Sequence, residues 1–168
     1  MKQTISIEDI NRIKEIYRDG EENGIKESEN PFIFRSDNKG YNTDLVSSET
    51  FFCDLRNKEL VDIVKKYIQL NEDTEYLSSI HYIHYKEGEE AKEHTDTLSS
   101  IRTYIMLLSD SFKGGEFYLE KEHIPFELGE MIKFDGSTKH SVKRVTEGNR
   151  EVLAMWINRI PKYSKSMI

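Results

Sequence analysis

From Thr74 onward the chain consists of short segments rich in β-branched and aromatic residues, separated by turns that contain glycine. The expected strands are Tyr76–Tyr85, Ile101–Leu108, Glu116–Leu119, Met131–Phe134, Ser141–Val145 and Val152–Ile157. Glycines lie between or beside them at positions 88, 114, 115, 129, 136 and 148. Short strands at such regular spacing, with no helical pattern between them, are typical of antiparallel two-sheet folds. This part of the sequence therefore predicts a β-sandwich or a jelly roll.

The first 75 residues have a different pattern. Apolar residues recur at helical spacing from Ser6 to Gly20, and again from near Asn57 to just before Asn71. Both segments are expected to be amphipathic helices, and the second is expected to pack one face against a sheet. Between them, Phe32–Phe34 is a short strand candidate and Arg35–Glu49 is expected to be a loop. The whole chain is thus predicted to be mainly β with N-terminal helices, an α+β arrangement.

Length and charge narrow the classes of protein. With 168 residues, the chain is expected to form one domain, 1–168, with helical support over about 1–75. No apolar run approaches the roughly 18 residues that span a bilayer, and no signal peptide is visible, so a soluble, cytoplasmic protein is expected. A net charge of −7 offers no general attraction for nucleic acid or anionic membrane. The lone Cys53 is expected to fill the core, and the oligomeric state stays open.

A candidate metal site begins with His94 and Asp96, two residues apart in Glu93-His94-Thr95-Asp96. On an extended strand, side chains at this spacing point to the same face, so an imidazole and a carboxylate can bind one ion together. His140 would complete a set of two histidines and one carboxylate. Such a set leaves three octahedral positions open and is diagnostic of non-haem Fe(II) oxygenases. A lone His-x-Asp pair would more often be a surface pair, but the second histidine favours a metal site.

The charge of such a site indicates a second ligand. Fe(II) carries two positive charges and Asp96 supplies one negative charge, so a chelating anion such as a 2-oxo acid fits the remainder. If that acid is 2-oxoglutarate, its far carboxylate needs a cation, and Arg150, ten positions after His140, can bind it with two parallel hydrogen bonds. Tyr85 is expected to donate a further bond to the acid, although an aromatic residue at a strand end is often core. Thr103 could also point into this pocket.

Several spaced motifs surround these residues. Tyr85 lies nine residues before His94, with Gly88 between them. The remaining pieces are Ser109-Asp110, the turn Gly114-Gly115-Glu116-Phe117, the segment Leu128–Phe134, the run His140, Val142, Val145, Gly148 and Arg150, and Trp156 beyond. As a set, they resemble the Fe(II)- and 2-oxoglutarate-dependent dioxygenases, specifically their prolyl 4-hydroxylase-like branch. The resemblance covers residues 76–159, about half of the chain.

The resemblance implies a double-stranded β-helix, a cupin-like jelly roll, over about residues 76–160, with the helices on its outer face. It also implies hydroxylation of an unactivated carbon, coupled to decarboxylation of 2-oxoglutarate to succinate and carbon dioxide. The implied cofactors are Fe(II), 2-oxoglutarate and O2, with ascorbate as a reductant of the iron. The implied site residues are the iron ligands His94, Asp96 and His140 and the cofactor-binding residues Arg150, Tyr85 and Thr103.

Two departures from the branch leave the substrate open. Leu107 stands where many collagen-type prolyl hydroxylases carry a tyrosine, and Ala91-Lys92-Glu93 stands where a proline or large aromatic residue is common. A protein side chain and a small molecule, such as a free amino acid, therefore remain alternative substrates. A jelly-roll binding module with a structural metal or none is a further alternative. The acidic charge balance argues against a nucleic-acid demethylase.

The sequence predicts the roles of the other histidines and of the nearby cationic residues less specifically. His81 and His84, three residues apart, face opposite sides of a strand and are expected to be structural, with His81 or Tyr82 as a possible lining of the pocket. His123 is expected on a surface loop. The cations near the distal histidine form either a solvated face or a basic rim that steers anions to the site. These cations are Lys139, Lys143 and Arg144.

Overall fold

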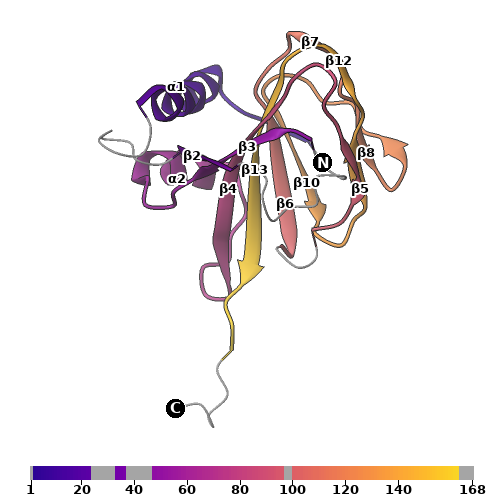
Figure 1. Ribbon diagram of the computed structural model, residues 1–168. Helices are drawn as coiled ribbons and strands as arrows, with labels where there is room; N and C mark the ends of the chain where they lie inside the picture. The colour runs from indigo at the N-terminus through magenta and orange to yellow at the C-terminus, as the bar shows by residue number, and fades with distance from the viewer. Residues whose placement is uncertain (1, 24–32, 37–46, 97–99, 163–168) are drawn as a thin grey trace.

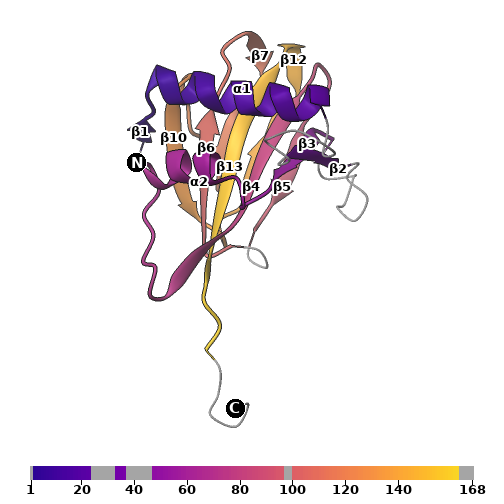
Figure 2. The same cartoon turned by 90° about the vertical axis from the view of Figure 1, so that its left-hand side faces the viewer.

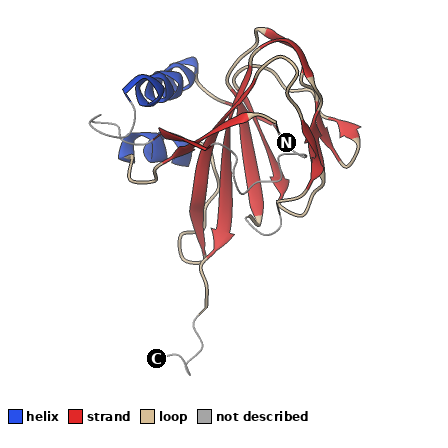
Figure 3. Cartoon of the chain, in the orientation of Figure 1, coloured by secondary structure: helices blue, strands red, loops and turns tan. Residues whose placement is uncertain are grey.

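Two antiparallel sheets facing each other form the body of the protein (Figures 1 and 3). The computed structural model describes residues 2–23, 33–36, 47–96 and 100–162. The larger sheet has the strand order β1-β10-β6-β13-β4-β3-β2, with β1 Lys2–Thr4, β10 Glu130–Asp135, β6 Arg102–Leu107, β13 Arg150–Arg159, β4 Glu75–Tyr85, β3 Glu49–Cys53 and β2 Ile33–Ser36. The smaller sheet has the order β5-β11-β8-β9, with β5 Ala91–His94, β11 His140–Val142, β8 Phe117–Leu119 and β9 Glu122–His123. A third pair joins β12 (Val145–Gly148) to β7 (Phe112–Gly114). This arrangement confirms the predicted jelly roll.

The larger sheet has two different faces. Its outer face is covered by α1 (Ile7–Asn23) and α2 (Lys58–Lys65), and α1 crosses the strands (Figure 2). Its inner face packs against the smaller sheet through a second apolar cluster. Alternation along β4 illustrates the division, because Tyr82 stacks on Tyr17 of α1 with ring centroids 3.8 Å apart while Tyr85 belongs to the inner cluster. The space between the sheets is therefore lined by alternate residues of the central strands.

The helices follow their sequence signals at the N-terminal ends. The amide of Asp9 donates to Ser6 Oγ over 3.2 Å, and Asn57 caps α2 by accepting from the amide of Leu60 over 3.0 Å. The predicted packing of the second helix on a sheet is confirmed, since its apolar face lies in the outer cluster. The first helix runs beyond the expected end at Gly20 to Asn23. No helix in the described part of the chain is long and apolar enough to span a membrane.

Two predicted segments have different bounds in the structure. The expected strand Ser141–Val145 is divided, because β11 ends at Val142 and β12 begins at Val145, with the amide of Lys143 donating to Glu116 O between them. The expected loop Arg35–Glu49 is wrong at both ends, since β2 extends to Ser36 and β3 begins at Glu49; positions 37–46 lie outside the described residues. The predicted burial of Cys53 is confirmed, and burial raises the pKa of its thiol to about 12.

Candidate metal centre

The three predicted ligands converge at one end of the space between the sheets. His94 ends β5, His140 begins β11, and the two residues are paired in register. The side-chain ligand atoms of His94, Asp96 and His140 all lie within 4.8 Å of one another. Asp96 Oδ1 is 3.9 Å from His94 Nε2, and Asp96 Oδ2 is 3.4 Å from His140 Nε2. These separations suit three ligands around one divalent cation.

Backbone carbonyls orient both imidazoles. His94 Nδ1 lies 2.6 Å from Lys92 O, and His140 Nδ1 lies 2.9 Å from Thr138 O. A ring nitrogen that faces a carbonyl oxygen must carry the hydrogen, which in a neutral ring leaves Nε2 with a lone pair that can bind a metal ion. Burial lowers the pKa of His140, while the nearby Asp96 carboxylate acts in the opposite direction. Neutral imidazoles with Nε2 toward one point are what a metal requires.

Two side chains of the larger sheet fix the carboxylate of Asp96. Thr103 Oγ1 donates to Asp96 Oδ2 over 3.1 Å, and Trp156 Nε1 donates to the same oxygen over 3.2 Å. Thr103 on β6 and Trp156 on β13 are neighbours in register, so the sheet itself sets the spacing of these two donors. The sequence had suggested Thr103 for the cofactor pocket, and the structure places it against Asp96, a predicted metal ligand.

Removing one of these donors is expected to weaken the metal site. We expect Thr103→Val, which keeps the side-chain shape but loses the hydroxyl, to lower Fe(II) affinity about tenfold, the lower end of the range for groups that orient metal ligands. Trp156 is the chain's single tryptophan, so an anaerobic Fe(II) titration followed by its fluorescence measures the effect. Thr146→Val, at an exposed position on β12, is the matched control. Equal affinities in the two variants would contradict this role.

A buried guanidinium lies further along the inner face of the larger sheet. Arg150 begins β13 and is 1% exposed. Within the described part of the chain, neither its Nε nor its Nη2 has a hydrogen-bond partner, and burial lowers its pKa. Its Cζ lies 5.4 Å from the ring centroid of Tyr85 and 5.8 Å from that of Phe126. A buried cation with unused donors is costly unless an anion joins it, so Arg150 is suited to a carboxylate.

The fold leaves room for this side chain at Gly115. A Cβ added there would lie 2.8 Å from Arg150 Cδ, and the backbone of Gly115 has a φ of +67°. Both the left-handed conformation and the close approach require glycine. The Gly-Gly turn noted in the sequence therefore shapes the pocket around the guanidinium.

The remaining predicted residue, Tyr85, lies beside Arg150. The two are paired across β4 and β13, and burial raises the pKa of Tyr85. Trp156 lies six residues from Arg150 along β13, about 20 Å at roughly 3.3 Å per residue. The inner face of β13 therefore carries Trp156 beside the predicted metal ligands and Arg150 near its other end. Sequence reasoning had noted Trp156 only as a feature of the last strand, since its contact with Asp96 depends on register.

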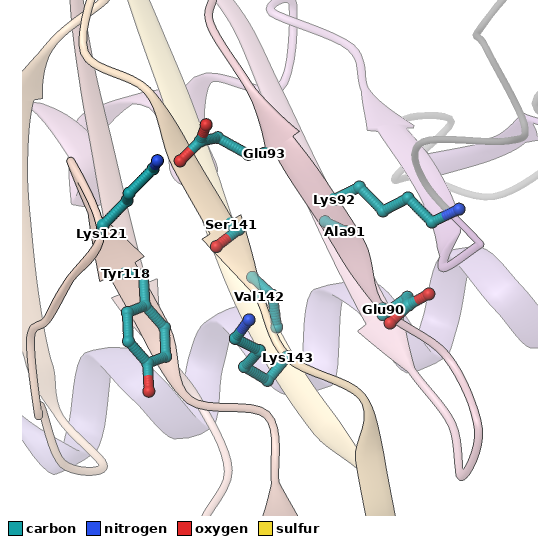
Figure 4. Close-up of a pocket in the computed structure, with 9 residues that line it drawn as sticks. All are labelled: Glu90, Ala91, Lys92, Glu93, Tyr118, Lys121, Ser141, Val142 and Lys143. Atoms are coloured by element: carbon teal, nitrogen blue, oxygen red, sulfur yellow. The ribbon is translucent and has the colours of Figure 1, made fainter.

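The cations near the distal histidine belong to a different surface. A hollow of about 420 Å³ lies on the outer face of the smaller sheet. Figure 4 shows the side chains that line it, Lys143 and Tyr118 among them. Lys143 Nζ lies there, 5.2 Å from the ring centroid of Tyr118, and Arg144 pairs with Glu90 over 3.5 Å. Along β11, His140 and Val142 are buried while the next residue, Lys143, is exposed. This placement favours the solvated face over a basic rim at the site.

Comparisons with known proteins agree with this geometry. The sequence profile of the 2OG-Fe(II) oxygenase superfamily matches residues 80–158. No curated protein sequence matches the chain.

Solved structures share the fold at low identity. The viral collagen prolyl hydroxylase vCPH from Paramecium Bursaria Chlorella virus-1, solved as a 2OG complex, is 18% identical with a TM-score of 0.69, and the match covers 96% of each chain. A Trichoplax adhaerens prolyl hydroxylase in complex with a hypoxia inducible factor peptide is 11% identical with a TM-score of 0.68, covering 94% of this chain and 82% of that one. The alpha ketoglutarate dependent epimerase SnoN from nogalamycin biosynthesis is 10% identical with a TM-score of 0.66, covering 92% of this chain and 74% of that one.

Proposed function

Because this chain belongs to the 2OG-Fe(II) oxygenase superfamily, we propose that it hydroxylates an unactivated carbon while 2-oxoglutarate is decarboxylated to succinate and carbon dioxide. One observation carries the proposal. The triad of His94, Asp96 and His140 meets the inner face of β13 at Trp156. The same strand carries the buried guanidinium of Arg150, whose Nε and Nη2 have no partner in the described part of the chain. A metal site alone would not require such a cation.

The side chains present fit Fe(II) and 2-oxoglutarate. Two neutral imidazoles and one carboxylate suit Fe(II) and leave room for further ligands. When bound, the iron and the 2-oxo acid together supply the activation of O2 and the oxidation of the substrate carbon. Ascorbate as a reductant of the iron is part of the proposal by family resemblance.

The chain's own residues have three tasks in this function. Trp156 and Thr103 hold the Asp96 carboxylate, and the two carbonyls hold the imidazoles, so the ligands need no rearrangement. Arg150 binds the far carboxylate of 2-oxoglutarate through charge-assisted hydrogen bonds. The apolar inner cluster, which includes Leu107, excludes water from the pocket and strengthens those bonds.

An anaerobic titration tests the proposal. Adding 2-oxoglutarate to the Fe(II) protein is expected to give a weak visible charge-transfer band, and admission of O2 is expected to give succinate. The control ligand is 2-oxobutyrate, which has the same chelating end but lacks the far carboxylate, so it should require a much higher concentration. A protein that binds iron yet gives neither band nor succinate would instead be a binding module with a structural metal.

A further inference from the structure

Three rings lie side by side on the inner face of the larger sheet, next to the predicted metal ligand Asp96. His81 on β4 lies opposite Phe52 on β3 in register, and its ring centroid is 4.3 Å from that of Phe52 at an interplanar angle of 78°. On the other side, the His81 and Trp156 centroids are 4.5 Å apart. The strands β3, β4 and β13 are adjacent in the sheet (Figure 1). We call Phe52, His81 and Trp156 the aromatic wall.

The wall faces the space between the sheets rather than the helices. Tyr82, the next residue along β4, stacks on Tyr17 of α1, so His81 points to the opposite face. Trp156 joins the wall to the metal centre, since its indole nitrogen donates to Asp96 Oδ2 over 3.2 Å. A molecule that lies against His81 and Trp156 is therefore close to Asp96, a predicted metal ligand.

His81 has hydrogen-bonding capacity that the fold does not use. Burial alone lowers its pKa, to about 4, and no charged side chain of the described residues contributes. The ring is thus neutral near pH 7, with one nitrogen as donor and the other as acceptor. Among the described residues, neither nitrogen has a hydrogen-bond partner. His81 is only partly buried, and its nitrogens are not among the buried polar atoms that lack a partner, so both are accessible to a ligand.

We propose that His81 is a specificity-determining residue that hydrogen-bonds an uncharged amide of the substrate next to the carbon to be hydroxylated. The faces of Phe52 and Trp156 pack the apolar part of that substrate. This inference rests on the proposed function and makes a residue within a peptide, rather than a free amino acid, the preferred substrate class. A peptide amide offers one donor and one acceptor, which matches a neutral imidazole.

The chemistry of the wall disfavours a free amino acid. Such a molecule carries an ammonium and a carboxylate beside its side chain, and both would lose water on entering the site. Charged groups tolerate this only when paired with fixed countercharges. The aromatic wall provides rings and a neutral imidazole but no charge.

Binding of blocked and free amino acids tests the proposal. The probes are N-acetyl amino-acid N-methylamides of each type and the corresponding free amino acids, added anaerobically to the full chain loaded with Fe(II) and 2-oxoglutarate. Fluorescence of the single tryptophan, Trp156, reports binding at the wall. At least one blocked amide is expected to bind at least about tenfold more tightly than its free amino acid and to raise succinate formation when O2 is admitted.

Variants of His81 separate recognition from packing. His81→Phe keeps a ring and is expected to raise both KM and the dissociation constant for that amide about tenfold, with little change in kcat. This is the effect of one lost hydrogen bond. His81→Gln, which retains a donor and an acceptor, is expected to recover part of the loss. His123→Phe, at an exposed position on β9, is the matched control and is expected to behave as the unchanged protein.

The outcomes distinguish this inference from the proposed function. The charge-transfer band and substrate-free succinate formation, measured in the unchanged protein and in His123→Phe, test the proposed function without involving His81. Their absence from the unchanged protein would overturn the proposed function. With both present, the inference on His81 is overturned if no blocked amide binds, if a free amino acid binds as tightly, or if His81→Phe binds the amide as the unchanged protein does.

Discussion

Replacing His140 with alanine is expected to abolish the charge-transfer band and all succinate formation that depends on 2-oxoglutarate. The imidazole is buried, and its Nε2 lies 3.4 Å from Asp96 Oδ2, so the change removes one of three ligands from the interior of the site. Groups that merely orient ligands contribute about 10- to 100-fold in metal affinity, and loss of a ligand is expected to exceed about 100-fold. Anaerobic Fe(II) titration and a succinate assay measure the two effects.

Loss of packing has to be separated from loss of the ligand. The His140 ring lies 4.8 Å from that of Phe134, centroid to centroid, so alanine also leaves a cavity. His140→Gln fills more of that space but provides a poor ligand, and it is expected to melt closer to the unchanged protein while remaining inactive. His123→Ala, on the exposed β9, is expected to keep full activity. A His140→Gln protein that retains the band would exclude His140 as an iron ligand.

The spacing argument grouped three residues that the structure also brings together, but it did so through an idealised geometry. It assumed one strand through His94 and Asp96, whereas β5 ends at His94 and Asp96 follows it. A backbone bond from the amide of Asp96 to Gly136 O, 2.8 Å long, keeps the carboxylate near the sheet instead. Residue type and spacing therefore located the candidate metal centre, while the contact that orients Asp96 came from a turn distant in sequence.

Contacts that depend on strand register could not be predicted. Thr103 and Trp156 meet at Asp96 only because β6 and β13 pair in one register, and a shift by one residue would turn both away. His81 joins Trp156 through the next pairing, between β13 and β4. Single strands encode which residues alternate, but the partner strand and its register are decided by the whole sheet.

Short strands at the sheet edges were missed for a related reason. β1 has three residues and β9 has two, too few to show alternation. β3 contains adjacent aromatic residues, Phe51 and Phe52, of which Phe51 is buried in the outer cluster while Phe52 joins the wall on the inner face. A run that is apolar on both faces has no period of two. The long central strands, in contrast, were predicted within one or two residues.

Replacing Arg150 with methionine is expected to have opposite effects on cofactor binding and on the stability of the ligand-free protein. Loss of a buried, hydrogen-bonded charge partner costs about 2–5 kcal/mol, so 2-oxoglutarate affinity is expected to fall between about 30-fold and several thousand-fold. The ligand-free protein, however, holds this guanidinium buried with unpaired donors, and burial lowers its pKa. Replacing such a charge by an apolar side chain is often neutral or stabilising.

Thermal melting with and without 2-oxoglutarate measures both effects at once. The unchanged protein is expected to melt at a higher temperature when the metal and 2-oxoglutarate are added, because a ligand that binds only the folded state stabilises it. In Arg150→Met, the ligand-free melting temperature is expected to hold or rise, and the shift caused by 2-oxoglutarate is expected to vanish. Arg150→Lys, which keeps a charge but not the planar pair of donors, is expected to retain part of the shift.

The direction in which the melting temperature of the ligand-free protein changes in Arg150→Met distinguishes a structural role of Arg150 from a role in cofactor binding. If Arg150 served the fold through the rings of Tyr85 and Phe126, methionine would lower the melting temperature and leave cofactor affinity nearly unchanged. If it is held in the interior for an anion, the protein tolerates an uncompensated charge until the carboxylate arrives. Evolution would then have retained a residue whose removal stabilises the empty fold, and only binding would account for its presence.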